Sequence, residues 1–146
     1  MDIIKILEKD RRLSNRKNWY SIMVIQKYLV ERSFDWLELY IDVKNKKLLG
    51  KGVLLVNERK YDIVLTYSVF DQIRYDKIYI NDKKIDFDRN IHLYRDLSLC
   101  LYHPILDQSY CNKISLKQLI PWISEWIVFY ELWKIYGIWL GNEHKH

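Results

Sequence analysis

One short segment of the chain collects most of the side chains that could carry out covalent chemistry. Cys100 lies at the end of an apolar, strand-like run, and Pro104 stops that run soon afterwards. Cysteine is one of the few side chains that can form a covalent acyl intermediate near neutral pH. The polar neighbours of the thiol in this segment are His92, Tyr94, Asp96, Ser98 and His103.

Two interpretations of Cys100 follow from its residue type. A thiol flanked by two histidines is a candidate nucleophile. Free cysteine is also among the most buried residue types, and it then behaves as a small hydrophobic side chain. Because the reactivity of a thiol depends on surroundings that a sequence does not show, both interpretations stay open at this point.

The composition predicts one folded domain, residues 1–146, to position this segment. Of the 146 residues, 49% are hydrophobic and 15% are aromatic, which is enough for a substantial core. Together with a charged fraction of 29%, these values argue against disorder.

Cysteine usage and the N-terminal residues predict a cytoplasmic protein. Cys100 and Cys111 are too few for a disulfide framework, so a reducing compartment is expected. The N-terminal residues lack the pattern of a signal peptide. No stretch reaches the roughly 18 uninterrupted apolar residues of a membrane span, so no membrane association is expected.

The charge and the missing motifs narrow the classes of ligand. The net charge of +5 permits an acidic partner, but no nucleic-acid-binding motif accompanies it, so a nucleic-acid partner is not expected. The chain has no glycine-rich phosphate loop, no CxxC pair and no HxxxH spacing. We therefore expect neither a cofactor nor a metal ion.

The first third of the chain is predicted to be helical. Ser14 can cap a helix that runs through Trp19 to about Arg32. A basic cluster lies at the start of this helix and consists of Arg11, Arg12, Arg16 and Lys17. Positive charge there would oppose the helix dipole, so this stretch could instead be a connector or a partner-facing turn. Whether residues 1–9 form a separate short helix is open.

Four strands joined by short polar turns come next. They are predicted over residues 34–43, 48–56, 61–69 and 77–80. The third is the clearest, because one set of alternate residues is uniformly apolar. Sequential strands with short connections pair in antiparallel fashion, so a meander is expected.

A last helix is predicted from about Ser115 to Gly137. Pro121 would kink or restart it, and Gly137 is a good C-terminal stop. The tryptophans expected mainly in the core are Trp122, Trp126, Trp133 and Trp139. The chain is therefore predicted to have an α+β fold. Its elements are an N-terminal helix, a four-stranded antiparallel meander, a cysteine-bearing segment and a C-terminal helix.

This order of elements resembles the ubiquitin-conjugating enzyme fold. In that family a histidine-proline-asparagine motif precedes a run that ends in the catalytic cysteine. The residues Ser98-Leu-Cys100-Leu101 match the end of that run, and His92 stands where the family has asparagine. The preceding histidine-proline pair is absent, because this chain has Asn90-Ile91 there.

A closer resemblance is to bacterial relatives of these enzymes that belong to CBASS antiphage operons. It is carried by residues 92–104, read as His-x-Tyr-x-Asp-x-Ser-Leu-Cys-Leu-Tyr-His-Pro. A C-terminal aromatic signature also matches, in Pro121-Trp-Ile-Ser-Glu-Trp126 and in residues 129–133 and 137–144. One departure is Leu97, where a glycine is usual.

The resemblance implies a specific activity and partner. Such proteins form an acyl link through the cysteine to the C-terminus of the operon's cGAS-like nucleotide cyclase, and they transfer it to a lysine or to water. This chain resembles the short form, which has no activating-enzyme domain. The alternative is an inactive conjugating-enzyme fold that serves as a binding module for the cyclase. The oligomeric state is not predicted.

The resemblance also suggests roles for the neighbours of Cys100. His92 would be the oxyanion donor or an organiser of the loop, unless it is a surface or capping histidine. His103 could accept a proton, although a His-Pro pair can also simply shape a turn. Asp96 could orient a histidine or assist an attacking lysine, or it could be a solvated turn carboxylate. Asp107 is a further candidate acid.

Overall fold

Two helices, rather than one, precede the sheet. The computed structural model describes residues 2–82, 84–102 and 114–141, and it begins with α1 (Ile3–Lys17) and α2 (Trp19–Ser33). The predicted N-cap at Ser14 is wrong, because Ser14 lies inside α1. The break falls at Asn18, whose side-chain amide donates a hydrogen bond back to the carbonyl of Ser14 at 3.0 Å.

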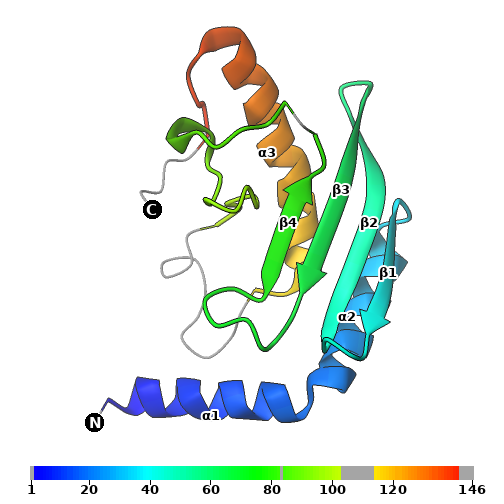
Figure 1. Cartoon of the computed structure of the whole chain (residues 1–146), viewed down its shortest axis with the longest axis vertical. Helices are drawn as coiled ribbons and strands as arrows, with labels where there is room; N and C mark the ends of the chain where they lie inside the picture. The colour runs from blue at the N-terminus through cyan, green and yellow to red at the C-terminus, as the bar shows by residue number, and fades with distance from the viewer. Residues whose placement is uncertain (1, 83, 103–113, 142–146) are drawn as a thin grey trace.

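The basic cluster that includes Arg16 and Lys17 therefore has a different electrostatic setting from the predicted one. It occupies the last turns of α1 rather than the first turn of a helix. Positive charge at the C-terminal end of a helix complements the helix dipole. Consequently the charge of the cluster stabilises α1 instead of destabilising it. In Figure 1, α1 runs across the lower end of the molecule, below the sheet.

The sheet is the predicted four-stranded antiparallel meander. Its strands are β1 (Leu37–Asp42), β2 (Lys47–Val56), β3 (Arg59–Tyr67) and β4 (Asp76–Ile80), in the order β1-β2-β3-β4. The first strand starts three residues later than predicted. The reason is that Phe34 still belongs to the end of α2, where its N–H donates to the carbonyl of Val30 at 2.9 Å.

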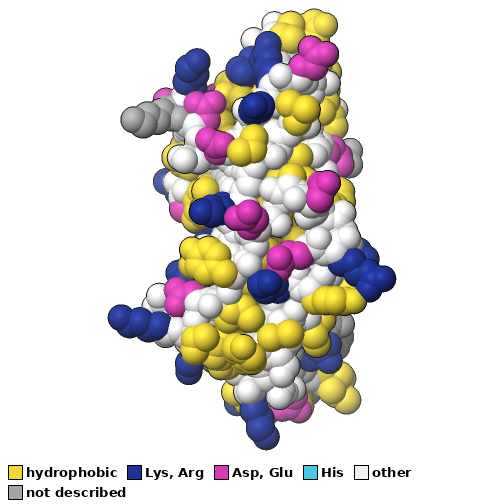
Figure 2. All heavy atoms as spheres, turned by 90° about the vertical axis from the view of Figure 1, so that its right-hand side faces the viewer, with side chains coloured by type: hydrophobic (Ala, Val, Ile, Leu, Met, Phe, Trp, Pro, Cys, Tyr) yellow, Lys and Arg dark blue, Asp and Glu magenta, His cyan; other side chains and the backbone are white. Residues whose placement is uncertain are grey.

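One face of the sheet packs on helices and holds the core. Alternate residues of β3 are buried, as the period of a half-buried strand requires. α2 contacts β1, β2 and the last helix, and both helices lie behind the sheet in Figure 1. Figure 2 shows the side of the molecule to the right of that view, where Lys and Arg are interspersed with Asp and Glu. This side therefore presents no continuous basic surface of the kind that nucleic acids prefer.

The last helix, α3 (Leu116–Tyr136), begins and ends as predicted. Ser115 and Gln118 form a capping box at its start. Gly137 ends it with a φ of 72° and donates its N–H to the carbonyl of Trp133 at 2.7 Å. Pro121 lies inside the helix and does not restart it. Trp126 and Trp139 are buried as expected, while Trp122 and Trp133 are half-buried against the core.

A buried carboxylate attaches α3 to the turn between β2 and β3. Glu131 accepts a hydrogen bond from the hydroxyl of Tyr61 at 2.5 Å and one from the amide of Asn57 at 2.9 Å. Burial alone would raise the pKa of Glu131, but these two bonds outweigh it and the net pKa is lowered. Burial and the bond to Glu131 raise the pKa of Tyr61 to about 12.

Glu131→Gln is expected to lower the free energy of unfolding by about 1–3 kcal/mol at neutral pH, because the charged acceptor is lost. A carboxyl whose folded pKa is depressed stabilises the fold above its unfolded pKa and loses that contribution as the pH falls. The difference between variant and wild type should therefore shrink in acid. Urea unfolding at neutral pH and near pH 3 measures it. Glu31→Gln, on an exposed ion pair with Lys27, is the control and should change little.

Candidate functional site

A short antiparallel ladder carries Cys100. Leu93 and Leu99 face each other in an isolated bridge. The N–H of Cys100 donates to the carbonyl of His92 at 3.0 Å, and the N–H of Tyr94 donates to the carbonyl of Ser98 at 2.9 Å. The N–H of Leu99 bonds in turn to the carbonyl of Ile78 at 2.8 Å. The ladder, which we call the cysteine hairpin (residues 92–100), is thus attached to the β4 edge of the sheet.

The turn of the cysteine hairpin contains a residue in the left-handed region. Leu97 has a φ of 72°, and its N–H donates to the carbonyl of Tyr94 at 2.9 Å. This conformation is the one that favours glycine, and the chain has leucine there. The Leu97 side chain is 39% exposed, so the turn tolerates it sterically at some cost in backbone strain.

Leu97→Gly is expected to raise the free energy of unfolding by about 0.5–1 kcal/mol. Relief of the left-handed strain, roughly 1–2 kcal/mol, should exceed the entropy that glycine loses on folding. Thermal or urea unfolding of the purified chain measures the change. Leu55→Gly is the matched control, since Leu55 is also exposed but lies in regular β2, and it should be destabilised. Equal destabilisation of the two variants would contradict the assignment of strain.

Cys100 forms part of the wall of an open cleft of about 420 Å³. The residue is 7% exposed, and its thiol donates to the carbonyl of Tyr102 at 3.5 Å. The opposite wall comes from α3 and from the residues that follow it. The aromatic side chains of that wall are Trp122, Trp126, Phe129 and Trp139. Glu125, which is exposed on α3, is the carboxylate among the described residues that line this cleft.

His92 lies in the same cleft as Cys100 and is held from two sides. Its backbone is left-handed, with a φ of 54°, and its ring stacks on Trp139 with 5.1 Å between the ring centroids. Its carbonyl accepts the N–H of Cys100 and also the indole N–H of Trp126 at 3.1 Å. Trp126 thus fixes the backbone directly opposite the cysteine, a contact that local sequence patterns do not indicate.

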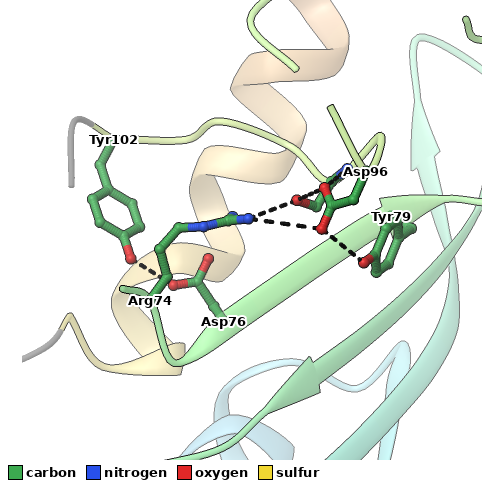
Figure 3. Close-up of polar contacts among 6 residues, drawn as sticks. Arg74, Asp76, Tyr79, Asp96 and Tyr102 are labelled. Atoms are coloured by element: carbon green, nitrogen blue, oxygen red, sulfur yellow. Dashed lines mark hydrogen bonds and ion pairs between the residues drawn. The ribbon is translucent and has the colours of Figure 1, made fainter. Parts of the chain in front are cut away.

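Behind the cysteine hairpin lies a polar cluster, of which Arg74 and Asp76 were not predicted from the sequence (Figure 3). Arg74, from the loop before β4, donates through Nη2 to the hydroxyl of Ser98 at 2.9 Å and lies 4.0 Å from Asp96. Asp76, which is 1% exposed, accepts a hydrogen bond from the hydroxyl of Tyr102 at 2.6 Å. One signal was available, because Asp76 shares the inward-facing register of β4 with Ile78 and Ile80.

Asp96 organises the turn of the hairpin. Its carboxylate accepts the backbone N–H of Ser98 at 2.9 Å, the hydroxyl of Ser98 at 2.5 Å and the hydroxyl of Tyr79 at 3.3 Å. Partial burial would raise the pKa of Asp96, but the bonds from Ser98, helped by Arg74, leave it lowered. These contacts are those of a turn carboxylate, and Figure 3 places Asp96 and Tyr102 on opposite sides of Arg74.

The structure therefore brings together two of the four predicted catalytic residues, Cys100 and His92, in one cleft. Asp96 lies in the turn of the same hairpin. His103 falls outside the described residues, as do the candidate acid Asp107 and the second cysteine, Cys111.

The comparison with protein families agrees with the resemblance drawn from the motifs. A family model described as "Type II CBASS E2 protein" matches residues 26–146, which include the sheet, the cysteine hairpin and α3. α1 and the first turns of α2 lie outside the match. No curated protein matches the chain. Among the described residues, no helix is long and apolar enough to cross a membrane.

Proposed function

This chain belongs to the family of type II CBASS E2 proteins, and from that membership we propose that it is a cysteine-dependent acyl transferase of the ubiquitin-conjugating type. The observation that carries the proposal is the position of Cys100 in the wall of an open cleft beside His92. A nucleophile within reach of a polarising donor is the arrangement that acyl transfer requires.

The proposed substrate is the C-terminus of the operon's cGAS-like nucleotide cyclase. A free carboxylate is a poor acyl donor, so the substrate is an activated form, an acyl adenylate or a thioester made by a separate enzyme. The Cys100 thiolate attacks the carbonyl carbon, a new carbon–sulfur bond forms, and the bond to the adenylate or thiol leaving group breaks. A lysine amine or water then attacks the thioester and releases the Cys100 thiol.

The neighbours of Cys100 take the following proposed roles. His92 donates a hydrogen bond to the oxyanion of each tetrahedral intermediate. Asp96 holds the turn that sets the position of the cysteine, through its bonds to Ser98. His103 remains the proposed proton acceptor for the thiol or the incoming amine. The aromatic walls of the cleft suit an extended peptide tail, because they can pack on its backbone and apolar side chains.

A synthetic peptide thioester that carries the C-terminal sequence of the neighbouring cyclase tests the proposal without an activating enzyme. The purified chain is incubated with it and analysed by intact mass spectrometry, before and after reduction with a thiol reagent. We expect an added mass equal to the acyl peptide that the reagent removes. A peptide of the same composition in scrambled order is the control for recognition of the tail.

The alternative function, a binding module for the cyclase, is favoured by one observation. Cys100 is almost fully buried, and its thiol already has a partner in the carbonyl of Tyr102. If the chain bound the intact cyclase tightly but formed no adduct with the peptide thioester, the binding module would replace the transferase as the proposed function.

A further inference from the structure

Arg74 is a buried cation that the proposed mechanism does not use. Its side chain is 9% exposed, although arginine is seldom buried unless it is paired. A buried ion pair adds little to stability compared with apolar packing. Arg74 makes its polar contacts with Ser98 and Asp96, both in the cysteine hairpin, as Figure 3 shows. These contacts join the loop before β4 to the hairpin that carries Cys100.

Tyr94 connects Arg74 with the thiol. The guanidinium carbon of Arg74 lies 3.5 Å from the centroid of the Tyr94 ring, which is close for a cation–π contact. In an antiparallel ladder, residues opposite each other share one face with their diagonal neighbours, two positions further along the partner strand. Because Leu93 pairs with Leu99, Tyr94 lies opposite Ser98. Cys100 is two positions beyond Ser98, so Tyr94 and Cys100 are diagonal neighbours on the same face.

This register places the Tyr94 phenol beside the Cys100 thiol, on one face of the cysteine hairpin. Burial, followed by the neighbouring Cys100, raises the pKa of Tyr94 far above its ordinary value. The phenol therefore keeps its proton throughout the neutral and mildly alkaline range. It can act as a donor to the sulfur at any pH at which the thiol ionises.

We infer that Arg74 and Tyr94 together set the reactivity of Cys100. The guanidinium, which lies between the carboxylates of Asp76 and Asp96, positions the Tyr94 ring. The phenolic O–H then donates to the sulfur once the thiol has lost its proton. Hydrogen-bond donors and nearby cations favour a thiolate over a thiol. The inference rests on the proposed function, in which this thiolate is the attacking group.

Three single variants of the full chain test the inference. Tyr94→Phe removes the hydroxyl and leaves the ring for Arg74. Arg74→Met removes the charge and keeps most of the length of the side chain. Tyr67→Phe is the matched control, because Tyr67 is also a buried tyrosine but its hydroxyl bonds to the carbonyl of Ile114.

The readout is the rate of alkylation by iodoacetamide as a function of pH. Mass spectrometry of the peptide that contains Cys100 separates this thiol from Cys111. We expect Tyr94→Phe to move the midpoint of the pH–rate curve upward by about one unit, which lowers the rate at pH 7 about tenfold. The rate at high pH, where the thiol is ionised in every variant, should not fall. Arg74→Met should shift the midpoint in the same direction, and Tyr67→Phe should not shift it.

A midpoint in Tyr94→Phe equal to that of the wild type would overturn the inference. A rise in rate at every pH would also overturn it, because that pattern reports a thiol uncovered by structural damage. If circular dichroism shows that Arg74→Met does not fold, Arg74→Lys replaces it and should give a smaller upward shift. The peptide-thioester assay is an independent test of the proposed function. A shifted midpoint without an acyl adduct would refute the transferase, but the inference that Arg74 and Tyr94 set the reactivity of Cys100 would still hold.

Discussion

Cys100→Ala is expected to abolish acyl transfer while the fold survives. Alanine lacks the sulfur that would form the thioester, and no other described cysteine lies in the cleft. Cys100 is a small side chain at the edge of the core, so the loss of the sulfur should cost about 1 kcal/mol of stability. The measurement is the adduct in the peptide-thioester assay, together with far-UV circular dichroism and thermal unfolding.

Cys100→Ser provides a chemical control for that result. Its hydroxyl is a much weaker nucleophile than a thiolate, and any adduct would be an oxygen ester that a thiol reagent does not cleave. An alanine variant that kept full activity would remove Cys100 from the mechanism. If the alanine variant still bound the cyclase with unchanged affinity, binding and chemistry would be separate properties of the cleft.

His92→Ala is expected to slow acyl transfer by about 10²–10³-fold, the effect of losing one oxyanion donor. The loss should fall on kcat rather than on KM, because the donor acts on charge that develops only in the transition state. The rate of transfer from the peptide thioester, measured over a range of peptide concentrations, separates the two constants. A loss of less than about threefold would assign His92 to the loop structure alone.

His92→Asn is the matched control. Asparagine tolerates the left-handed backbone that His92 adopts, at a φ of 54°, and its amide is also a hydrogen-bond donor. It should retain most of the activity that alanine loses. Thermal unfolding of both variants corrects for stability, since alanine is strained in this conformation and loses the stacking on Trp139.

Much of the fold could be predicted because it depends on local patterns. The alternation in β3 arises from one buried and one exposed face, and the end of α3 follows from the freedom of Gly137 to adopt a positive φ. The helix start at Ser14 was wrong for a physical reason. A residue type that can cap a helix can also lie inside one. Here the next residue in the helix, Asn15, donates a hydrogen bond to the hydroxyl of Tyr75, 60 positions away, and local sequence does not indicate such a contact.

For this protein, the sequence by itself determined the family, the α+β fold with its strand order, and the thiol that the proposed function depends on. Tertiary structure alone decided what surrounds that thiol. Trp126 reaches the carbonyl of His92 across 34 positions of the chain, and Arg74 reaches Ser98 across 24. Local periodicity says which face of an element is buried, but contacts between elements depend on how α3 and β4 pack together, and a single sequence carries no direct record of that packing.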